Sequence, residues 1–439
     1  MMRYFTGGLL LASLMISCSA SRHIRKTADS TLFSDSVLQN AHVGIAIYDP
    51  EKKKYLYQHQ ADRFFTPASN TKIVSLYAGL KYLPALLDGA YYQETTDSVF
   101  IQPTGDPTLL HPDFTSQPVF DFIKSQTKPI GINEGNWGTA ALGNGWSWSD
   151  YGTSYMVERS PLPVYGNVIR WTQTRDSSSL AALVQQEAFV FSEPDIDWKV
   201  RFNFDTAAGT FSVKRSYLEN EFFITQGKET HATREVAFIT NGLASSLELL
   251  SEASGKSIRA TTTQLTVPRL ISSQPADSML KKMMERSDNF YAEQTLLMAA
   301  GKKFGTMNER RMIQHLLANE LKDFPQFPVW VDGSGLSRYN LFTPLDFVWI
   351  LNKMQHEYGM ERMKVLFPAG GAGTLKNYYI SDIPYIFAKT GTLSGVVSLS
   401  GYLYTRSGKL LIFSFLVNNC TQPAASVRKK VETFLTGLR

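Results

Sequence analysis

The hydrophobic pattern of this 439-residue chain changes twice, and this change most constrains how the chain can fold. Residues 42–48 form an apolar run typical of a strand, and residues 73–83 have the apolar spacing of a helix. A long middle stretch then alternates in the manner of strands, before helical periods resume and strands follow near the end. The pattern predicts an α+β protein in which a mostly β region, residues 101–264, is inserted between residues 31–100 and 265–439.

Composition excludes several classes of protein. Apolar residues make up 43% of the chain and charged residues 19%, which is enough for a buried core and excludes a disordered chain. The 44 Lys and Arg against 39 Asp and Glu leave a net charge of +5, a weak basis for nucleic-acid binding, and we expect none. Two cysteines cannot form a disulfide scaffold or a four-cysteine zinc site, and the seven histidines show no metal spacing. We therefore expect no metal and no cofactor.

The N-terminus has the form of an export signal. The apolar run of residues 9–16 follows Arg3 and is too short to span a bilayer, which needs about 20 residues. A basic start, a short apolar centre and small residues near the end are typical of a signal peptide, here residues 1–17. We expect the protein to be exported to the periplasm.

The end of this signal, LMISC, resembles a bacterial lipobox, in which the chain is cut before a cysteine that then carries lipid. Cys18 would be that cysteine, and the polar residues 18–30 would form a tether to a bacterial membrane. The alternative is an ordinary signal peptide with an incidental cysteine.

A first motif is S-x-x-K, formed by Ser69 and Lys72 at the start of the helix predicted over residues 73–83. A spacing of three on a helix brings the two side chains to one face, about 5–6 Å apart at Cβ. A serine hydroxyl needs a base to become a nucleophile. A lysine can serve if burial or a nearby positive charge lowers its pKa. Alone the motif is weak, because it recurs by chance on surface helices.

A second motif is S-x-N, formed by Ser287 and Asn289 in a segment that otherwise has helical periods and is rich in Met. Two small polar residues flanked by apolar ones fit a polar pair exposed in a cleft. Alone, the pair is better explained as a helix cap or a surface pair.

A third motif is K-T-G, formed by Lys389, Thr390 and Gly391 and followed by Thr392, after an apolar run typical of a strand. Gly391 would let a ligand backbone approach closely. Lys389 would supply positive charge, and the threonine hydroxyls could donate hydrogen bonds to a carboxylate. An edge-strand lysine beside a bulge would also explain this stretch alone.

In this order the three motifs resemble the serine penicillin-recognising enzymes. The long gap between Lys72 and Ser287 is similar to that of the low-molecular-mass class C penicillin-binding proteins, the D-alanyl-D-alanine carboxypeptidase/endopeptidase family. The stretches GDPTL at 105–109 and DGSGLSR at 332–338 add to the resemblance, although we expect Asp332 itself to hold a structural turn. The resemblance runs from about Ser34 to the C-terminus and is faint within the insertion.

The resemblance implies a β-lactamase/transpeptidase-like fold, with an antiparallel sheet flanked by helices and a helical subdomain. It also implies an acyl-enzyme mechanism on peptidoglycan stem peptides, with β-lactams as covalent inhibitors. The catalytic residues would be Ser69, Lys72 and Ser287, and the substrate-binding residues Asn289, Lys389, Thr390, Gly391 and Thr392. The backbone N–H groups of Ser69 and Thr392 would form the oxyanion hole.

Two other functions stay open at this point. One is a β-lactamase or esterase on the same scaffold, although no separate base for deacylation has its own motif. The other is a non-catalytic lipoprotein that binds peptidoglycan, although such a protein has no need of a nucleophile and a base. Carboxypeptidase and endopeptidase action are not distinguished, and neither is the oligomeric state.

Overall fold

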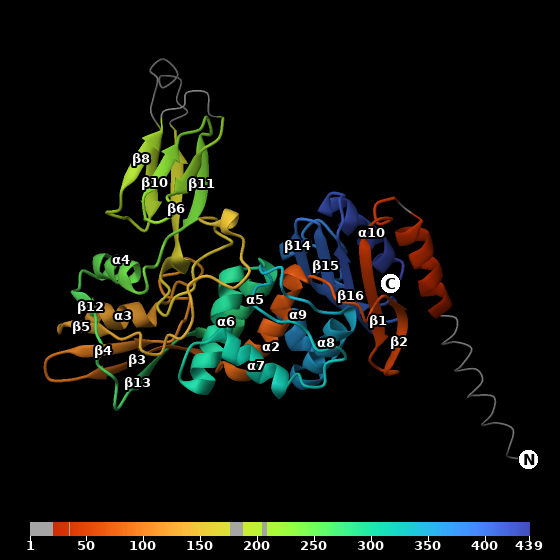
Figure 1. The fold of residues 1–439 in the computed structure, drawn as a ribbon, viewed down its shortest axis with the longest axis horizontal. Coiled ribbons are helices and arrows are strands. Elements are labelled where there is room, and N and C mark those ends of the chain that lie inside the picture. The colour runs from red at the N-terminus through yellow and green to blue at the C-terminus, as the bar shows by residue number, and fades with distance from the viewer. Residues whose placement is uncertain (1–20, 35, 176–187, 204–208) are drawn as a thin grey trace, which may run out of the picture. The chain divides into compact units, whose positions relative to one another are not determined.

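The computed structural model describes residues 21–34, 36–175, 188–203 and 209–439 (Figure 1). Cys18 and the predicted signal peptide lie outside the described residues. The chain divides into two compact units. The first contains residues up to Tyr77, Leu280–Asp288 and Ile313–Arg439, and the second contains Ala78–Met279 and Asn289–Met312. The chain passes from one unit to the other within helices α2 (Lys72–Tyr82), α5 (Ala276–Glu285) and α7 (Glu309–Ala318), and also between Asp288 and Asn289.

The first unit is built on a five-stranded antiparallel sheet to which both ends of the chain contribute (Figure 1). Its order is β14 (Ile386–Leu393), β15 (Val396–Tyr404), β16 (Leu410–Asn418), β1 (His42–Asp49) and β2 (Lys54–His59). β14, β15 and β16 follow one another as hairpins, whereas β1 pairs with β16 in a register that sets Ile45 opposite Phe415. The strands near the two ends of the chain are therefore neighbours.

Helices cover both faces of this sheet, as the period-two alternation of strand residues requires. Ile45 and Phe415 belong to the buried core that also contains Val431 of α10 (Ala424–Thr436). On the opposite face, the Tyr402 hydroxyl donates a hydrogen bond of 2.8 Å to the Leu351 carbonyl of α8 (Pro344–Tyr358). The short helix α9 (Met360–Leu366) follows α8.

The start of the described chain packs on the same core. Residues 21–28 are helical and continue into a π-helical turn, η1 (Asp29–Phe33). Ile24, Ala28 and Leu32, each four residues apart, are buried with the residues of the sheet and α10. Most of the segment predicted as a tether is therefore a packed helix, because its few apolar residues share one helical face.

The second unit contains the whole region predicted as inserted, residues 101–264, together with residues 78–100, 265–279 and 289–312, and it is rich in strands. A five-stranded sheet has the order β12 (Ile258–Ala260), β5 (Ile130–Ile132), β4 (Val99–Pro103), β3 (Leu86–Glu94) and β13 (Arg269–Pro275). One three-stranded sheet has the order β11 (His231–Ala237), β6 (Val168–Thr174) and β7 (Phe189–Glu193). A second three-stranded sheet has the order β8 (Val200–Asn203), β10 (Phe222–Thr225) and β9 (Ser212–Arg215). The helices α3 (Pro118–Ser125), α4 (Ala244–Ser254) and α6 (Asn289–Phe304) complete the unit. The predicted α+β class is confirmed.

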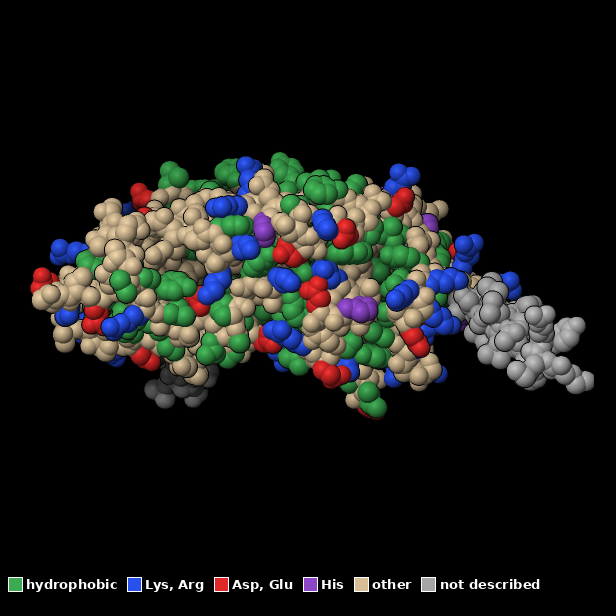
Figure 2. All heavy atoms as spheres, turned by 90° about the horizontal axis from the view of Figure 1, so that it is seen from below, with side chains coloured by type: hydrophobic (Ala, Val, Ile, Leu, Met, Phe, Trp, Pro, Cys, Tyr) green, Lys and Arg blue, Asp and Glu red, His purple; other side chains and the backbone are tan. Residues whose placement is uncertain are grey.

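Charged side chains of both signs are interspersed on the face shown in Figure 2, in keeping with the small net charge. Within the described residues, every helix is too short or too polar to cross a bilayer.

A turn formed by residues 332–337 packs against the segment that carries Ser69. The Asp332 carboxylate accepts hydrogen bonds from the N–H groups of Gly335, at 2.8 Å, and Ser337, at 2.7 Å, as expected of a structural turn. Gly335 has a left-handed backbone with φ of 80°, and a Cβ there would overlap the carbonyl oxygen of Ala68. Only glycine fits both the backbone conformation and this close approach.

The substitution Gly335→Ala should therefore destabilise the protein by more than the cost of a left-handed alanine, about 1–2 kcal/mol. Gly408→Ala is a matched control, because Gly408 has a similar φ of 78° but open space where a Cβ would stand. Urea unfolding would measure both free energies. Equal losses in the two variants would contradict the close packing at Gly335.

Candidate active site

Ser69 lies in a tight turn just before a buried helix. The turn, η2 (Ala68–Thr71), is 3₁₀-helical, and α2 begins at Lys72. The sequence predicted Ser69 in the first turn of the α-helix, whereas the structure places it in the 3₁₀ turn that precedes this helix. The cause is Ala68, whose left-handed φ of 49° is incompatible with α-helical geometry. The Thr71 hydroxyl stabilises the turn by donating a 2.9 Å hydrogen bond to the Ala68 carbonyl.

The Lys72 ammonium contacts the Ser69 hydroxyl. Lys72 Nζ is 3.0 Å from Ser69 Oγ and also donates to the Ser334 carbonyl at 2.7 Å. Lys72 is 0% exposed, whereas Ser69 is only partly buried. The hydrogen bond to the turn of residues 332–337 thus fixes the position of the amine next to the Ser69 hydroxyl. At this distance a proton can pass between the two groups when the amine is neutral.

Strand β14 runs directly beside Ser69. The Asn70 side-chain amide donates a 2.9 Å hydrogen bond to the Lys389 carbonyl. A Cβ at Gly391 would stand 2.9 Å from the Ser69 backbone nitrogen and would overlap the Ser398 hydroxyl. Gly391 therefore permits the close approach of β14 to the turn that carries Ser69. The sequence predicted that Gly391 would let a ligand backbone approach closely. In the structure, it is the protein's own backbone at Ser69 that approaches this glycine.

The Lys389 ammonium points to a second serine. Lys389 Nζ donates to Ser287 Oγ at 2.8 Å and to the Thr390 carbonyl at 2.8 Å, and the residue is 0% exposed. Burial lowers the pKa of Lys389 well below its usual range, and the positive charges of Lys72 and Arg428 lower this pKa further. The site thus contains two buried lysines, each within hydrogen-bond distance of a serine.

The sequence had suggested that Ser287 lies within a helical segment, but the structure places it in a break between two helices. α5 ends at Glu285 and α6 begins at Asn289. Between them the Asp288 N–H donates a 3.1 Å bond back to the Met283 carbonyl, and Ser287 has a left-handed φ of 61°. This geometry is that of a Schellman helix end, in which a non-glycine residue takes the position that glycine prefers. Local hydrophobic spacing does not reveal such a break.

The structure brings Ser69, Lys72, Ser287 and Lys389 together in the first unit. Asn289 belongs to the second unit, where its side-chain amide donates a 2.8 Å hydrogen bond to the Tyr155 carbonyl.

The end of the third motif faces solvent beside an arginine. Thr390 is 6% exposed, and Thr392 is exposed at the end of β14. The Arg428 guanidinium, from α10, donates a hydrogen bond to Thr392 Oγ1. Sequence patterns did not single out Arg428, because it stands on a surface helix outside every motif. Only the packing of α10 against the sheet brings its charge to this place.

Across the ranges that the structure describes, no group of three or more His, Cys, Asp or Glu side chains is placed to hold a metal ion. Cys420 is a free, buried thiol two residues after the end of β16.

Solved structures of other proteins have the same fold as this chain. The H. influenzae penicillin-binding protein 4 has the same fold, with a TM-score of 0.73, 17% identity, and coverage of 94% of this chain and 98% of that one. A predatory peptidoglycan endopeptidase of Bdellovibrio bacteriovorus has a TM-score of 0.51 at 14% identity, covering 90% of this chain and 93% of that one.

Curated relatives match part of the sequence. The D-alanyl-D-alanine carboxypeptidase DacB of Haemophilus influenzae is 29% identical over 161 residues, which are 33% of this chain and 32% of that protein. A carboxypeptidase DacB of Mycolicibacterium smegmatis is also 29% identical over 161 residues, 34% of this chain and 35% of that protein. The match spans about a third of the length of these relatives.

The family model of the D-Ala-D-Ala carboxypeptidase 3 (S13) family matches residues 25–437, almost the whole chain. The resemblance that the three motifs indicated is confirmed. This chain belongs to the D-Ala-D-Ala carboxypeptidase 3 (S13) family.

Proposed function

We propose that this protein is a serine carboxypeptidase or endopeptidase that cleaves D-Ala-D-Ala-type bonds of peptidoglycan peptides and is acylated by β-lactams. The observation that carries the proposal is the 3.0 Å contact between the buried Lys72 amine and the partly exposed Ser69 hydroxyl. A serine beside a lysine, without a histidine, is the arrangement expected of this class of acyl transfer.

In the acylation step, Ser69 Oγ attacks the carbonyl carbon of the scissile peptide bond, and the neutral Lys72 amine takes the hydroxyl proton. The backbone N–H groups of Ser69 and Thr392 are proposed to stabilise the oxyanion. Loss of one such donor typically lowers the rate by about 10²–10³-fold. Collapse of the intermediate breaks the C–N bond and leaves a serine ester, which water then hydrolyses.

The leaving amine needs a proton, and Ser287 is proposed to relay it. The Lys389 ammonium, 2.8 Å from Ser287 Oγ, can replace the proton that the hydroxyl gives up. The lowered pKa of Lys389 suits this role, because it makes the ammonium a better proton donor than that of an ordinary lysine.

Substrate binding is proposed to fall to the end of β14 and to Asn289. Thr390 and Thr392 offer hydroxyls, Gly391 keeps the strand close to Ser69, and the amide of Asn289 would hold the substrate backbone. Because the Lys389 ammonium is buried, we assign much of the positive charge at the carboxylate subsite to Arg428, which contacts Thr392.

Export and anchoring remain part of the same proposal. Peptidoglycan lies outside the cytoplasmic membrane, so a signal peptide over residues 1–17 and a lipid on Cys18 would bring the enzyme to its substrate.

Penicillin should add one covalent adduct to the native protein and none to Ser69→Ala, measured as intact mass. Lys72→Met should slow acylation by about 10²–10⁴-fold, because the general base is lost. Ser407→Ala, at an exposed serine of a hairpin loop, should acylate as the native protein does. An adduct that persists in Ser69→Ala would overturn the assignment of the nucleophile.

Release of free D-alanine from a pentapeptide ending in D-Ala-D-Ala would support carboxypeptidase action, and cleavage of cross-linked peptidoglycan would support endopeptidase action. Fast turnover of nitrocefin would instead favour a β-lactamase. Absence of all three activities would favour a non-catalytic binding protein.

Arg428→Met should lower kcat/KM about tenfold or more for a peptide with a free C-terminal carboxylate, and much less for the same peptide as its amide. A charge-assisted hydrogen bond is typically worth about 1.5–3 kcal/mol, which is the physical reason. Lys429→Met is the control, because Lys429 is exposed and pairs with Glu432. Equal losses on the acid and the amide would contradict a role in carboxylate binding.

The buried Lys389 should make stability depend on pH. Its pKa is lowered on folding, so between that pKa and about 10.4 the unfolded chain binds more protons, and stability rises with pH. The free energy of unfolding of the native protein, relative to Lys389→Met, should therefore increase from pH 7 to pH 9.5, by up to about 1.4 kcal/mol per pH unit. Lys364→Met, at a lysine that pairs with Glu361 at the surface, should show no such increase. A flat or falling difference for Lys389→Met would contradict the lowered pKa.

A further inference from the structure

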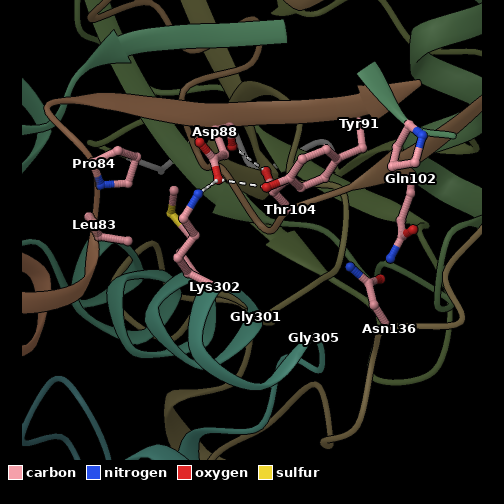
Figure 3. Close-up of a pocket in the computed structure, with 12 residues that line it drawn as sticks. Leu83, Pro84, Asp88, Tyr91, Gln102, Thr104, Asn136, Gly301, Lys302 and Gly305 are labelled. Carbon is pink, nitrogen blue, oxygen red and sulfur yellow. Dashed lines mark hydrogen bonds and ion pairs between the residues drawn. The ribbon is translucent and has the colours of Figure 1, made fainter. Parts of the chain in front are cut away.

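A cavity of about 270 Å³ lies within the second unit, and none of the residues that line it belongs to the three motifs (Figure 3). Strand β3 contributes Asp88 and Tyr91, strand β4 contributes Gln102, and the last turns of α6 contribute Met298 and Lys302. All five residues belong to the same compact unit. The cavity is therefore a feature of the second unit in its own right.

One wall of the cavity holds an ion pair. Lys302 Nζ donates to Asp88 Oδ2 at 2.7 Å, and the Tyr91 hydroxyl donates to the same oxygen at 2.8 Å, as the dashed lines of Figure 3 show. Asp88 is 8% exposed, whereas the Lys302 side chain is 43% exposed. The hydrogen bond to Asp88 raises the pKa of Lys302, so Lys302 stays charged at neutral pH.

Both members of the pair keep unused hydrogen-bonding capacity. Among the described residues, only Lys302 and Tyr91 bond to the Asp88 carboxylate, and both use the same oxygen, which leaves Oδ1 as a free acceptor. An ammonium has three N–H donors, and Lys302 uses one of them on Asp88. The Asp88 carboxylate and the Lys302 ammonium, which both line the cavity, can thus accept and donate further hydrogen bonds.

The other walls are mostly apolar. Leu83, Pro84 and Met298 line the cavity, and Gln102 extends its side chain from the neighbouring strand. The volume lies just below the roughly 300–1,000 Å³ typical of pockets for drug-sized ligands, so the ligand must be small.

We propose that this cavity binds a small zwitterion with an ammonium and a carboxylate on one aliphatic carbon, that is, an α-amino acid with a short apolar side chain. The ligand carboxylate accepts hydrogen bonds from Lys302, the ligand ammonium donates to Asp88, and the side chain lies against the apolar wall. Because the Asp88–Lys302 pair is neutral overall, an anion alone is repelled by Asp88 and a cation alone by Lys302. Free D-alanine has this chemistry, and its choice as the natural occupant rests on the proposed function.

Titration of the full-length protein with D-alanine, followed by calorimetry or by ligand-observed NMR, tests the proposal. D-alanine should bind, while D-lactate, which lacks the ammonium, and ethylamine, which lacks the carboxylate, should bind about tenfold more weakly or worse. Lys302→Met keeps the aliphatic stem, removes the charge and should weaken D-alanine binding by a similar factor. Lys303→Met is the matched control on the next residue of the helix and should bind D-alanine as the native protein does.

Two results would overturn the proposal: absence of D-alanine binding to the native protein, or equal binding by Lys302→Met. The second would mean that D-alanine binds elsewhere, for example at the proposed catalytic residues, and that the ion pair only joins α6 to β3.

Penicillin acylation of the same samples separates this proposal from the proposed function. Lys302→Met should acylate at the native rate, because Lys302 is not among the proposed catalytic residues. If the native protein binds D-alanine but is not acylated, the cavity assignment stands and the proposed function fails. If L-alanine binds as well as D-alanine, the zwitterion class stands, and the assignment of D-alanine as the natural occupant falls.

Discussion

The contact between a buried amine and a partly exposed hydroxyl, Lys72 with Ser69, is the constraint on which the first unit depends. Lys72 donates a hydrogen bond to the Ser334 carbonyl, which fixes the position of its amine. The turn that carries this carbonyl is itself stabilised by hydrogen bonds to the Asp332 carboxylate. The left-handed backbones of Ala68 and Gly335 allow the two segments to approach each other. A rigid support of this kind keeps the proposed nucleophile and its proposed base within reach of each other without further reorganisation.

The same region gathers positive charge, which is costly to bury. Lys389 shares its surroundings with Lys72 and Arg428, and burial together with these charges lowers its pKa. Ser287, with its left-handed backbone, accepts a hydrogen bond from Lys389 and helps to offset the loss of solvation. Strain and perturbed pKa values that occur together in one place are typical of functional sites, and here they coincide with all three sequence motifs.

The second unit is more than a spacer between the motifs. It has its own sheets and its own hydrophobic core, and it carries Asn289 at the start of α6. The C-terminal turns of the same helix carry Lys302 to the cavity beside Asp88. One helix therefore begins at a residue of the second motif and ends at a separate group of charged side chains within the same unit.

The sequence by itself determined the three motifs, whose residues are proposed to carry the chemistry, the α+β class, and several of the strands and helices. The motif residues Ser69, Lys72 and Lys389 were found because their spacing and residue types are local properties, and so were β1 and the helix after Ser69. The tertiary structure alone decided that β1 pairs with β16, that Ser287 ends a helix in a left-handed turn, and that Arg428 stands beside Thr392. It also decided that residues 21–28 pack on the core as a helix. The physical reason is that hydrophobic periodicity shows only which type of element a residue belongs to and which side of that element is buried. Strand partners, left-handed helix ends and charges brought in by distant helices depend on packing between segments far apart in the chain.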